Sequence, residues 1–176
     1  MKKNIVLAAF VAIFAFAVAA SAQKAGDLSG KWNLDIAKSD LGQAAAMIKS
    51  QTVTITQAGT SFKVATTTER NAPPADAAGG GGRPGGGGGM GGGGGEQSYT
   101  LDGKEVSTER QTQNGPVTTK TTATQTGNKI VITSVFPTPN GDMKSTSTYE
   151  LSADGKTLTV TRESTRGSSK SVYTKG

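Results

Sequence analysis

Residues 99–176 read YTLDGKEVSTERQTQNGPVTTKTTATQTGNKIVITSVFPTPNGDMKSTSTYELSADGKTLTVTRESTRGSSKSVYTKG, and glycine-bearing turn pairs recur in this run every 12 to 14 residues. The segments between the pairs are rich in Thr, Val, Ile, Tyr and Ser, which favour a pleated strand. Asn-Gly and Asp-Gly supply the positive φ angles that two-residue hairpin loops require. An antiparallel meander is therefore predicted, with turns at Asp102-Gly103, Asn114-Gly115, Gly127-Asn128, Asn140-Gly141, Asp154-Gly155 and Arg166-Gly167.

The sequence before this run predicts further strands and one helix. An alanine-rich stretch at 41–49 predicts a short helix, with Ser39 or Asp40 as its cap. A meander of about 8–10 strands normally curls and closes, because closure removes both exposed edges. We therefore expect an all-β, up-and-down barrel, with a two-sheet sandwich as the alternative. Besides those of the C-terminal run, the predicted strands lie at residues 29–35, 51–57 and 61–69.

The N-terminus has the pattern of a secretory signal peptide. Lys2 and Lys3 precede an apolar stretch at 5–19, and the small residues of 20–22 form a cleavage signal before Gln23. An apolar stretch of about 15 residues is too short to favour a membrane span. We expect residues 1–22 to be cleaved, the mature protein to be periplasmic or extracellular, and no stable membrane insertion to remain.

The mature chain, residues 23–176, has the length of one domain. Its pattern of strands is broken at 71–95, where two prolines precede a glycine tract. Of the seventeen residues 79–95, fourteen are glycine. Such a segment buries nothing and has a large ordering entropy, so a disordered loop inserted into the barrel domain is predicted. A phosphate-binding loop would need a helix after it and a positioned Lys-Ser/Thr pair, and neither is present, which argues against that interpretation.

Composition excludes several classes of function. The chain has neither cysteine nor histidine, so disulfides are absent and the commonest general base and transition-metal ligand are missing. The formal net charge is +6, and +4 without Lys2 and Lys3. This surplus is scattered over the strands and forms no nucleic-acid-binding patch. No nucleophile has an activating base, so we expect no enzyme, no metal and no cofactor.

Period-two alternation assigns the side chains that face inward. Large apolar groups are few on this face, whereas hydroxyls are many. Either the barrel is flattened around a thin core, or its interior keeps space behind a hydroxyl lining. The predicted inward sets are Ile130, Ile132, Ser134, Phe136, then Met143, Ser145, Ser147, Tyr149, Leu151, then Leu158, Val160, Arg162. We take as candidate ligand-binding residues Ile132, Ser134, Ser145, Ser147, Tyr149 and Tyr173.

The first strand carries a resemblance to a known family. Gly30-Lys31-Trp32 at the start of a meander barrel resembles the calycins, which comprise the lipocalins and the fatty-acid-binding proteins. The ending at 171–175 is similar to the second group. The Asp-Gly-Lys-x-Leu-x-Val hairpin at 154–160 is similar to that of secreted bacterial lipocalin-like proteins. The resemblance covers both ends of the chain, and the middle as a strand pattern.

The resemblance implies structural roles for Trp32 and Arg162, and it shows that one ligand-binding arginine of the family is missing here. In calycins this tryptophan plugs the closed end of the barrel under an arginine from a late strand. Trp32 is thus expected at the barrel floor, with Arg162 as its cation–π partner. Fatty-acid-binding proteins hold the ligand carboxylate with Arg-x-Tyr on the last strand, but the matching positions here are Ser171 and Tyr173. The charge for a fatty-acid head group is therefore missing at that place.

Two hypotheses of function follow. The first is an exported, lipocalin-like, non-catalytic protein that binds a small apolar or amphipathic molecule, and it requires an internal cavity. The second is a structural or interaction β-domain of the cell envelope or extracellular space with no small ligand. A bound lipophilic mass in the purified protein would distinguish the first from the second.

Overall fold

The computed structural model describes residues 26–71, 95–112, 115–138, 141–165 and 167–176. The predicted signal peptide and nearly all of the predicted loop lie outside these residues. The elements in chain order are β1 (Gly30–Leu34), η1 (Ile36–Lys38), η2 (Gly42–Met47), β2 (Ile48–Ala58), β3 (Ser61–Arg70), β4 (Gly95–Thr100), β5 (Val106–Thr112), β6 (Gly115–Thr126), β7 (Lys129–Thr138), β8 (Gly141–Leu151), β9 (Thr157–Ser164) and β10 (Gly167–Lys175).

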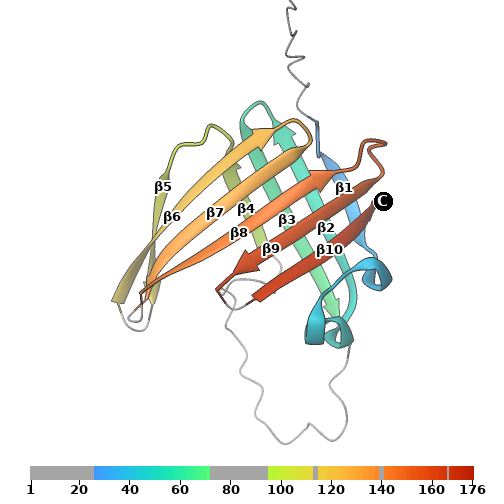
Figure 1. Cartoon of the computed structure of the whole chain (residues 1–176), viewed down its shortest axis with the longest axis horizontal. Helices are drawn as coiled ribbons and strands as arrows, with labels where there is room; N and C mark the ends of the chain where they lie inside the picture. Colours follow the sequence, from blue (N-terminus) through green and yellow to red (C-terminus); the bar gives the residue numbers. More distant parts are fainter. Residues whose placement is uncertain (1–25, 72–94, 113–114, 139–140, 166) are drawn as a thin grey trace, which may run out of the picture.

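All ten strands belong to one antiparallel sheet with the order β4-β3-β2-β1-β10-β9-β8-β7-β6-β5. Each strand pairs with the next one along the chain except at β4 and β5, and β1 pairs with β10. Figure 1 shows the sheet curled on itself, with β2 and β3 passing behind β8 and β9. The predicted all-β meander of up to ten strands is confirmed. The seam of the barrel lies between β4 and β5.

Five of the six predicted turn pairs join strands that pair with each other. At Gly127, for example, φ is +58°, the left-handed conformation that favours glycine in a tight turn. The chain does turn at Asp102-Gly103, where Gly103 has a φ of +74°, but the hairpin predicted there is wrong, because β4 and β5 form no ladder. The chain there turns onto β6 instead: Gly103 N donates to Ala123 O at 3.0 Å, and Asp102 forms a bridge with Thr124.

The helix predicted at 41–49 is instead a 3-10 helix, η2, and a second 3-10 helix, η1, precedes it. Asp35 caps η1 through the Lys38 amide, whereas η2 has no side-chain cap. Gly42 adopts a φ of +54° at the start of η2, and β-branched Ile48 already pairs with Arg70 in the sheet. The remaining residues are too few for a stable α-helix. Among the described residues, no helix is long and apolar enough to cross a membrane.

The apolar core lies inside the barrel. Its buried members come from both layers of the curled sheet, and their relative exposure is 4% or less. Figure 1 shows the β2–β3 and β6–β7 turns at one end of the barrel and η1 and η2 towards the other. The core is formed by Leu28, Trp32, Val53, Ile55, Phe62, Val64, Ala123, Ile130, Ile132, Tyr149, Leu158, Val160 and Tyr173.

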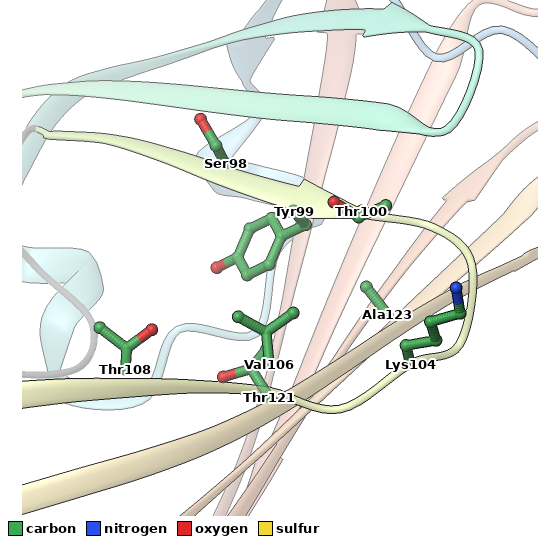
Figure 2. Close-up of a pocket in the computed structure, with 8 residues that line it drawn as sticks. All are labelled: Ser98, Tyr99, Thr100, Lys104, Val106, Thr108, Thr121 and Ala123. Carbon is green, nitrogen blue, oxygen red and sulfur yellow. The ribbon is translucent and has the colours of Figure 1, made fainter.

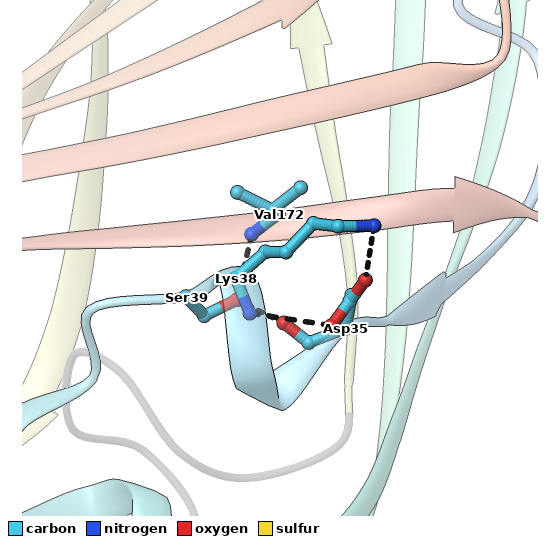
Figure 3. Close-up of polar contacts among 4 residues, drawn as sticks. All are labelled: Asp35, Lys38, Ser39 and Val172. Carbon is cyan, nitrogen blue, oxygen red and sulfur yellow. Dashed lines mark hydrogen bonds and ion pairs between the residues drawn. The ribbon is translucent and has the colours of Figure 1, made fainter.

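A serine side chain adds to the backbone hydrogen bonds that join the η1 segment to the last strand. Ser39 Oγ accepts a hydrogen bond from Val172 N at 2.8 Å and donates one to Asp35 O at 2.7 Å. Figure 3 shows Ser39 beside β10, with Lys38 and Asp35 joined on the same turn. The Lys38–Asp35 ion pair, at 2.9 Å, is largely exposed at the lysine. Ser39 thus supplies the partner that a buried residue of β10 needs.

Replacing Ser39 with alanine is expected to lower the free energy of unfolding by about 1 to 2 kcal/mol, because the Val172 amide is left without a partner. Urea denaturation followed by far-UV circular dichroism measures the change. The matched control is Lys38→Ala, which removes an exposed ion pair and should change stability by less than about 0.5 kcal/mol. Equal effects of the two substitutions would contradict the role given to Ser39.

Candidate ligand-binding site

The inward face of the barrel changes in character along its length. One end is filled by the largest fully buried side chains, Trp32, Phe62, Leu28, Ile130 and Leu158. Further along, small hydroxyl side chains take their place. Ser134 lies opposite Ser145 on β8 and opposite Thr121 on β6, with 3.1 Å between Thr121 Oγ1 and Ser134 Oγ. These three positions are partly exposed, so this end of the interior is not packed with apolar groups.

The six candidate ligand-binding residues share this inward face. In the register, Ile132 lies opposite Ser147, and Tyr149 lies between Ile130 and Val160. Tyr173 is placed on the opposite side of β9, facing Leu158. The structure therefore places the predicted residues on three strands, β7, β8 and β10, within a run of four adjacent strands. Three of the six are buried, namely Ile132, Tyr149 and Tyr173. The other three are partly exposed, namely Ser134, Ser145 and Ser147.

Trp32 is fully buried and has a cation above its ring, but this cation is not the predicted one. The indole Nε1 donates to Leu28 O at 3.0 Å, and Lys175 Nζ lies 5.5 Å from the ring centroid. Trp32 and Lys175 are directly opposite each other on β1 and β10. The predicted Trp32–Arg162 pair is therefore wrong, and Lys175 is the cation over the ring.

Arg162 lies far from Trp32 because a short hairpin fixes its place. Ser164 pairs with Gly167 at the β9–β10 turn, so Arg162 pairs with Ser169. Ser169 is six residues before Lys175 on β10, a separation of about 20 Å along the strand. Arg162 therefore belongs to the hydroxyl-lined half of the barrel, opposite Ser147 on β8.

All three tyrosines of the chain lie close to this arginine. The Phe62 ring bridges the barrel, with its centroid 6.4 Å from that of Tyr99 and 5.4 Å from that of Tyr149. Burial raises the pKa of each phenol, to about 12 for Tyr99, and the Arg162 guanidinium opposes the rise. Tyr173 Oη donates to Gln51 Oε1 at 2.7 Å. A positive charge, that of Arg162 on the neighbouring strand β9, thus acts on Tyr173.

Tyr99 is a site residue that the sequence analysis missed. It is on β4, and its hydroxyl donates to Gln97 Oε1 at 2.7 Å. Its alternation with Gln97 and Leu101 was a signal that it faces inward. The hairpin predicted at Asp102-Gly103 paired the strand of Tyr99 with β5. The sequence therefore gave no indication that Tyr99 lies near β8.

A hollow of about 160 Å³ lies in the seam between the two edge strands. Figure 2 shows the Tyr99 ring pointing from β4 towards Val106 and Thr108 of β5. Val106 is 50% exposed, a large apolar side chain without full cover. Ligand pockets for drug-sized molecules measure about 300–1,000 Å³, so this hollow is the size of one ring and is too small for a long acyl chain. It is lined by Ser98, Tyr99, Thr100, Lys104, Val106, Thr108, Thr121 and Ala123.

The carboxylates offer little chemistry to this interior. Every Asp or Glu on a described strand occupies an exposed, outward position. In the part of the chain that the structure describes, no three His, Cys, Asp or Glu side chains gather as a metal ion would require. The described residues of the inward face include hydroxyl groups, aromatic rings and the exposed guanidinium of Arg162, which are groups that bind and orient a molecule.

Comparison with known proteins identifies the fold. The sequence matches no protein-family model and no curated protein. Among solved structures, the fatty acid transporter REP1-NXSQ is 18% identical over 85% of this chain and 96% of its own, with a TM-score of 0.50. Human cRBP IV is 14% identical over 86% and 99%, with a TM-score of 0.50. Apo lipid binding protein 8 of Caenorhabditis elegans is 14% identical over 84% and 94%, with a TM-score of 0.52.

The fold is that of a calycin barrel, and within that class it is similar to the fatty-acid-binding-protein type. The resemblance seen at Gly30-Lys31-Trp32 is thereby confirmed for the fold. At these identities the likeness concerns the backbone arrangement, and the function has to be argued from the side chains of this chain.

Proposed function

We propose that this protein is an exported, non-catalytic carrier that binds a small apolar or amphipathic molecule inside its barrel. The observation that carries the proposal is the unequal filling of the interior. One end is packed with large apolar side chains, whereas the other has hydroxyl groups, a partly covered Val106 and a hollow in the seam. Structural neighbours whose names include a fatty acid transporter and a lipid binding protein support the same class of ligand.

The volume of the hollow limits the size of the ligand that we propose. Because the large side chains of the core occupy the closed end, a ligand has to lie between the seam and the hydroxyl-lined half. A space of about 160 Å³ accommodates a ring or a short chain. Export is supported by the pattern of residues 1–22, and cleavage before Gln23 is the expected maturation step.

Native mass spectrometry of the protein, purified without detergent from an exporting host, tests the proposal. We expect a chain that begins at Gln23 and a reproducible added mass that disappears on organic extraction. The extracted protein should then bind the neutral lipophilic fluorophore N-phenyl-1-naphthylamine. A bare mass together with no binding of the fluorophore would overturn the carrier function and favour an interaction domain without a small ligand. An uncleaved N-terminus would overturn export alone.

A further inference from the structure

The edge of β4 that faces the seam has unpaired backbone groups. In an antiparallel ladder, residues alternate between those that bond to the neighbouring strand and those whose N–H and C=O point away from it. Leu101 N donates to Thr60 O at 2.7 Å, in line with the register of β3 and β4. The backbone groups of Tyr99, two residues earlier, therefore also point to β3. Those that point into the seam belong to Glu96, Ser98 and Thr100.

The edge of β5 has the same alternation. Ala123 O accepts a hydrogen bond from Gly103 N on the β5 side of β6, so the backbone groups of Thr121 also point towards β5. Thr121 pairs with Val106, whose N–H and C=O are therefore used by β6. No ladder joins β4 to β5 within the described residues, so each edge can accept an added strand. The backbone groups of β5 that point into the seam include those of Ser107 and Glu109.

Between the two edges lies a recess for one aromatic side chain. The hollow of about 160 Å³ is lined by Tyr99 of β4 and Val106 of β5, and a cavity of about 150 Å³ holds a benzene molecule. Figure 2 shows the Tyr99 ring pointing towards Val106 across this space. A residue directly opposite Tyr99 on an added strand has its side chain on the same face of the sheet. A ring at that position would fill the hollow and cover Val106, which is 50% exposed.

The outer side of the seam is acidic beyond the hollow. Glu96 of β4 and Glu109 of β5 are exposed, and both lie on the side of the hollow away from the 101–105 turn. Among the described residues, no ion pair includes Glu109, and Glu96 has only a long contact of 3.9 Å with Lys63. A basic side chain opposite Glu96 would have a carboxylate on each neighbouring strand, so its charge is complementary to this part of the seam.

We propose that the seam binds an extended segment of a partner protein, which pairs as an antiparallel strand with β4 and has an aromatic residue opposite Tyr99 and a basic residue opposite Glu96. The register sets these two residues three positions apart, so the ring points inwards and the basic side chain outwards. The residues opposite Ser98 and Thr100 exchange backbone hydrogen bonds with β4. This inference goes beyond the carrier function because it concerns a protein partner, and either proposal can fail without the other.

The peptide acetyl-Thr-Phe-Thr-Ser-Lys-amide has this spacing and is the probe. In an NMR titration of the isotopically labelled protein, we expect it to shift the amide resonances of Ser98 and Thr100 and to slow their exchange with water. Glycine in place of the phenylalanine should weaken binding about 10- to 100-fold, because the ring no longer fills the hollow. N-methylation of the second threonine removes the donor to Ser98 O and should weaken binding about 3- to 10-fold. Equal binding of the N-methylated peptide, or no shift at Ser98 and Thr100, would overturn the strand pairing.

Charge reversal tests the register. Glu96→Lys should weaken the lysine peptide about 3- to 5-fold and strengthen, by a similar factor, a peptide with glutamate at that place. The matched control is Glu150→Lys, which reverses an exposed carboxylate on β8 and should leave both affinities unchanged. Equal responses of the two variants would overturn the register. A dimer in size-exclusion chromatography without peptide would show that a second copy covers the edge, and it would overturn the proposed partner.

Discussion

Replacing Trp32 with alanine is expected to lower the free energy of unfolding by about 3 to 5 kcal/mol. The side chain is fully buried in the closed end, opposite Val53 on β2. Its loss would leave a cavity, and the Leu28 carbonyl would lose the indole donor at 3.0 Å. Because Trp32 is the one tryptophan of the chain, urea denaturation has to be followed by far-UV circular dichroism.

Two control variants separate packing from charge. Trp32→Phe keeps an aromatic ring but lacks the indole N–H, so we expect a smaller loss of about 1 to 3 kcal/mol. Lys175→Met removes the cation over the ring and should change stability by less than about 1 kcal/mol, since the lysine is exposed. A change below about 1 kcal/mol for Trp32→Ala would mean that the closed end is not the stabilising core.

Raising the pH above 10 is expected to destabilise the protein through its three tyrosines. Burial raises the pKa of Tyr99, Tyr149 and Tyr173, for Tyr99 to about 12. Unfolded tyrosines release their protons near pH 10, so above that pH the unfolded state binds fewer protons than the folded state. The free energy of unfolding therefore falls as the pH rises. For Tyr99 alone the loss between pH 10 and 12 is about 2 to 3 kcal/mol.

Urea denaturation at several pH values from 8 to 11.5, with phenolate absorbance measured in parallel, tests this expectation. Below pH 9 the curve should be flat with respect to these groups. Tyr99→Phe should reduce the alkaline loss, because its hydroxyl no longer ionises in the unfolded state. Phenols that titrate near pH 10 in the folded protein, without any loss of stability, would contradict the buried environment assigned to them.

The strand pattern was predictable because side-chain alternation and turn residues are local. The inward positions of Ile130, Ile132 and Tyr149 follow from a period of two, and glycine pairs fixed five hairpins. The hairpin predicted at Asp102-Gly103 was wrong because a turn residue shows where the chain bends. It does not show which strand the chain pairs with after the bend. A hydrogen bond to Ala123 on β6 decided that question.

The candidate site was predictable only in part, since it depends on which strands face each other across the barrel. Hydroxyl positions on β7 and β8 could be read from the sequence, but Tyr99 reaches them from β4 through Phe62. Arg162 was assigned to the wrong end by resemblance. Counting back from the Ser164–Gly167 pair would have placed it beside Ser169, because a short hairpin fixes its register.

Pairing of β1 with β10 has a consequence for the kinetics of folding. Trp32 can meet its partner Lys175 only after almost the whole chain is available. Such long-range pairing folds slowly, because the loop-closure entropy is lost before the contacts form. During synthesis the barrel therefore stays open at this junction. For the export that we propose, such a delay would keep the first and last strands unpaired until the chain reaches a translocation channel.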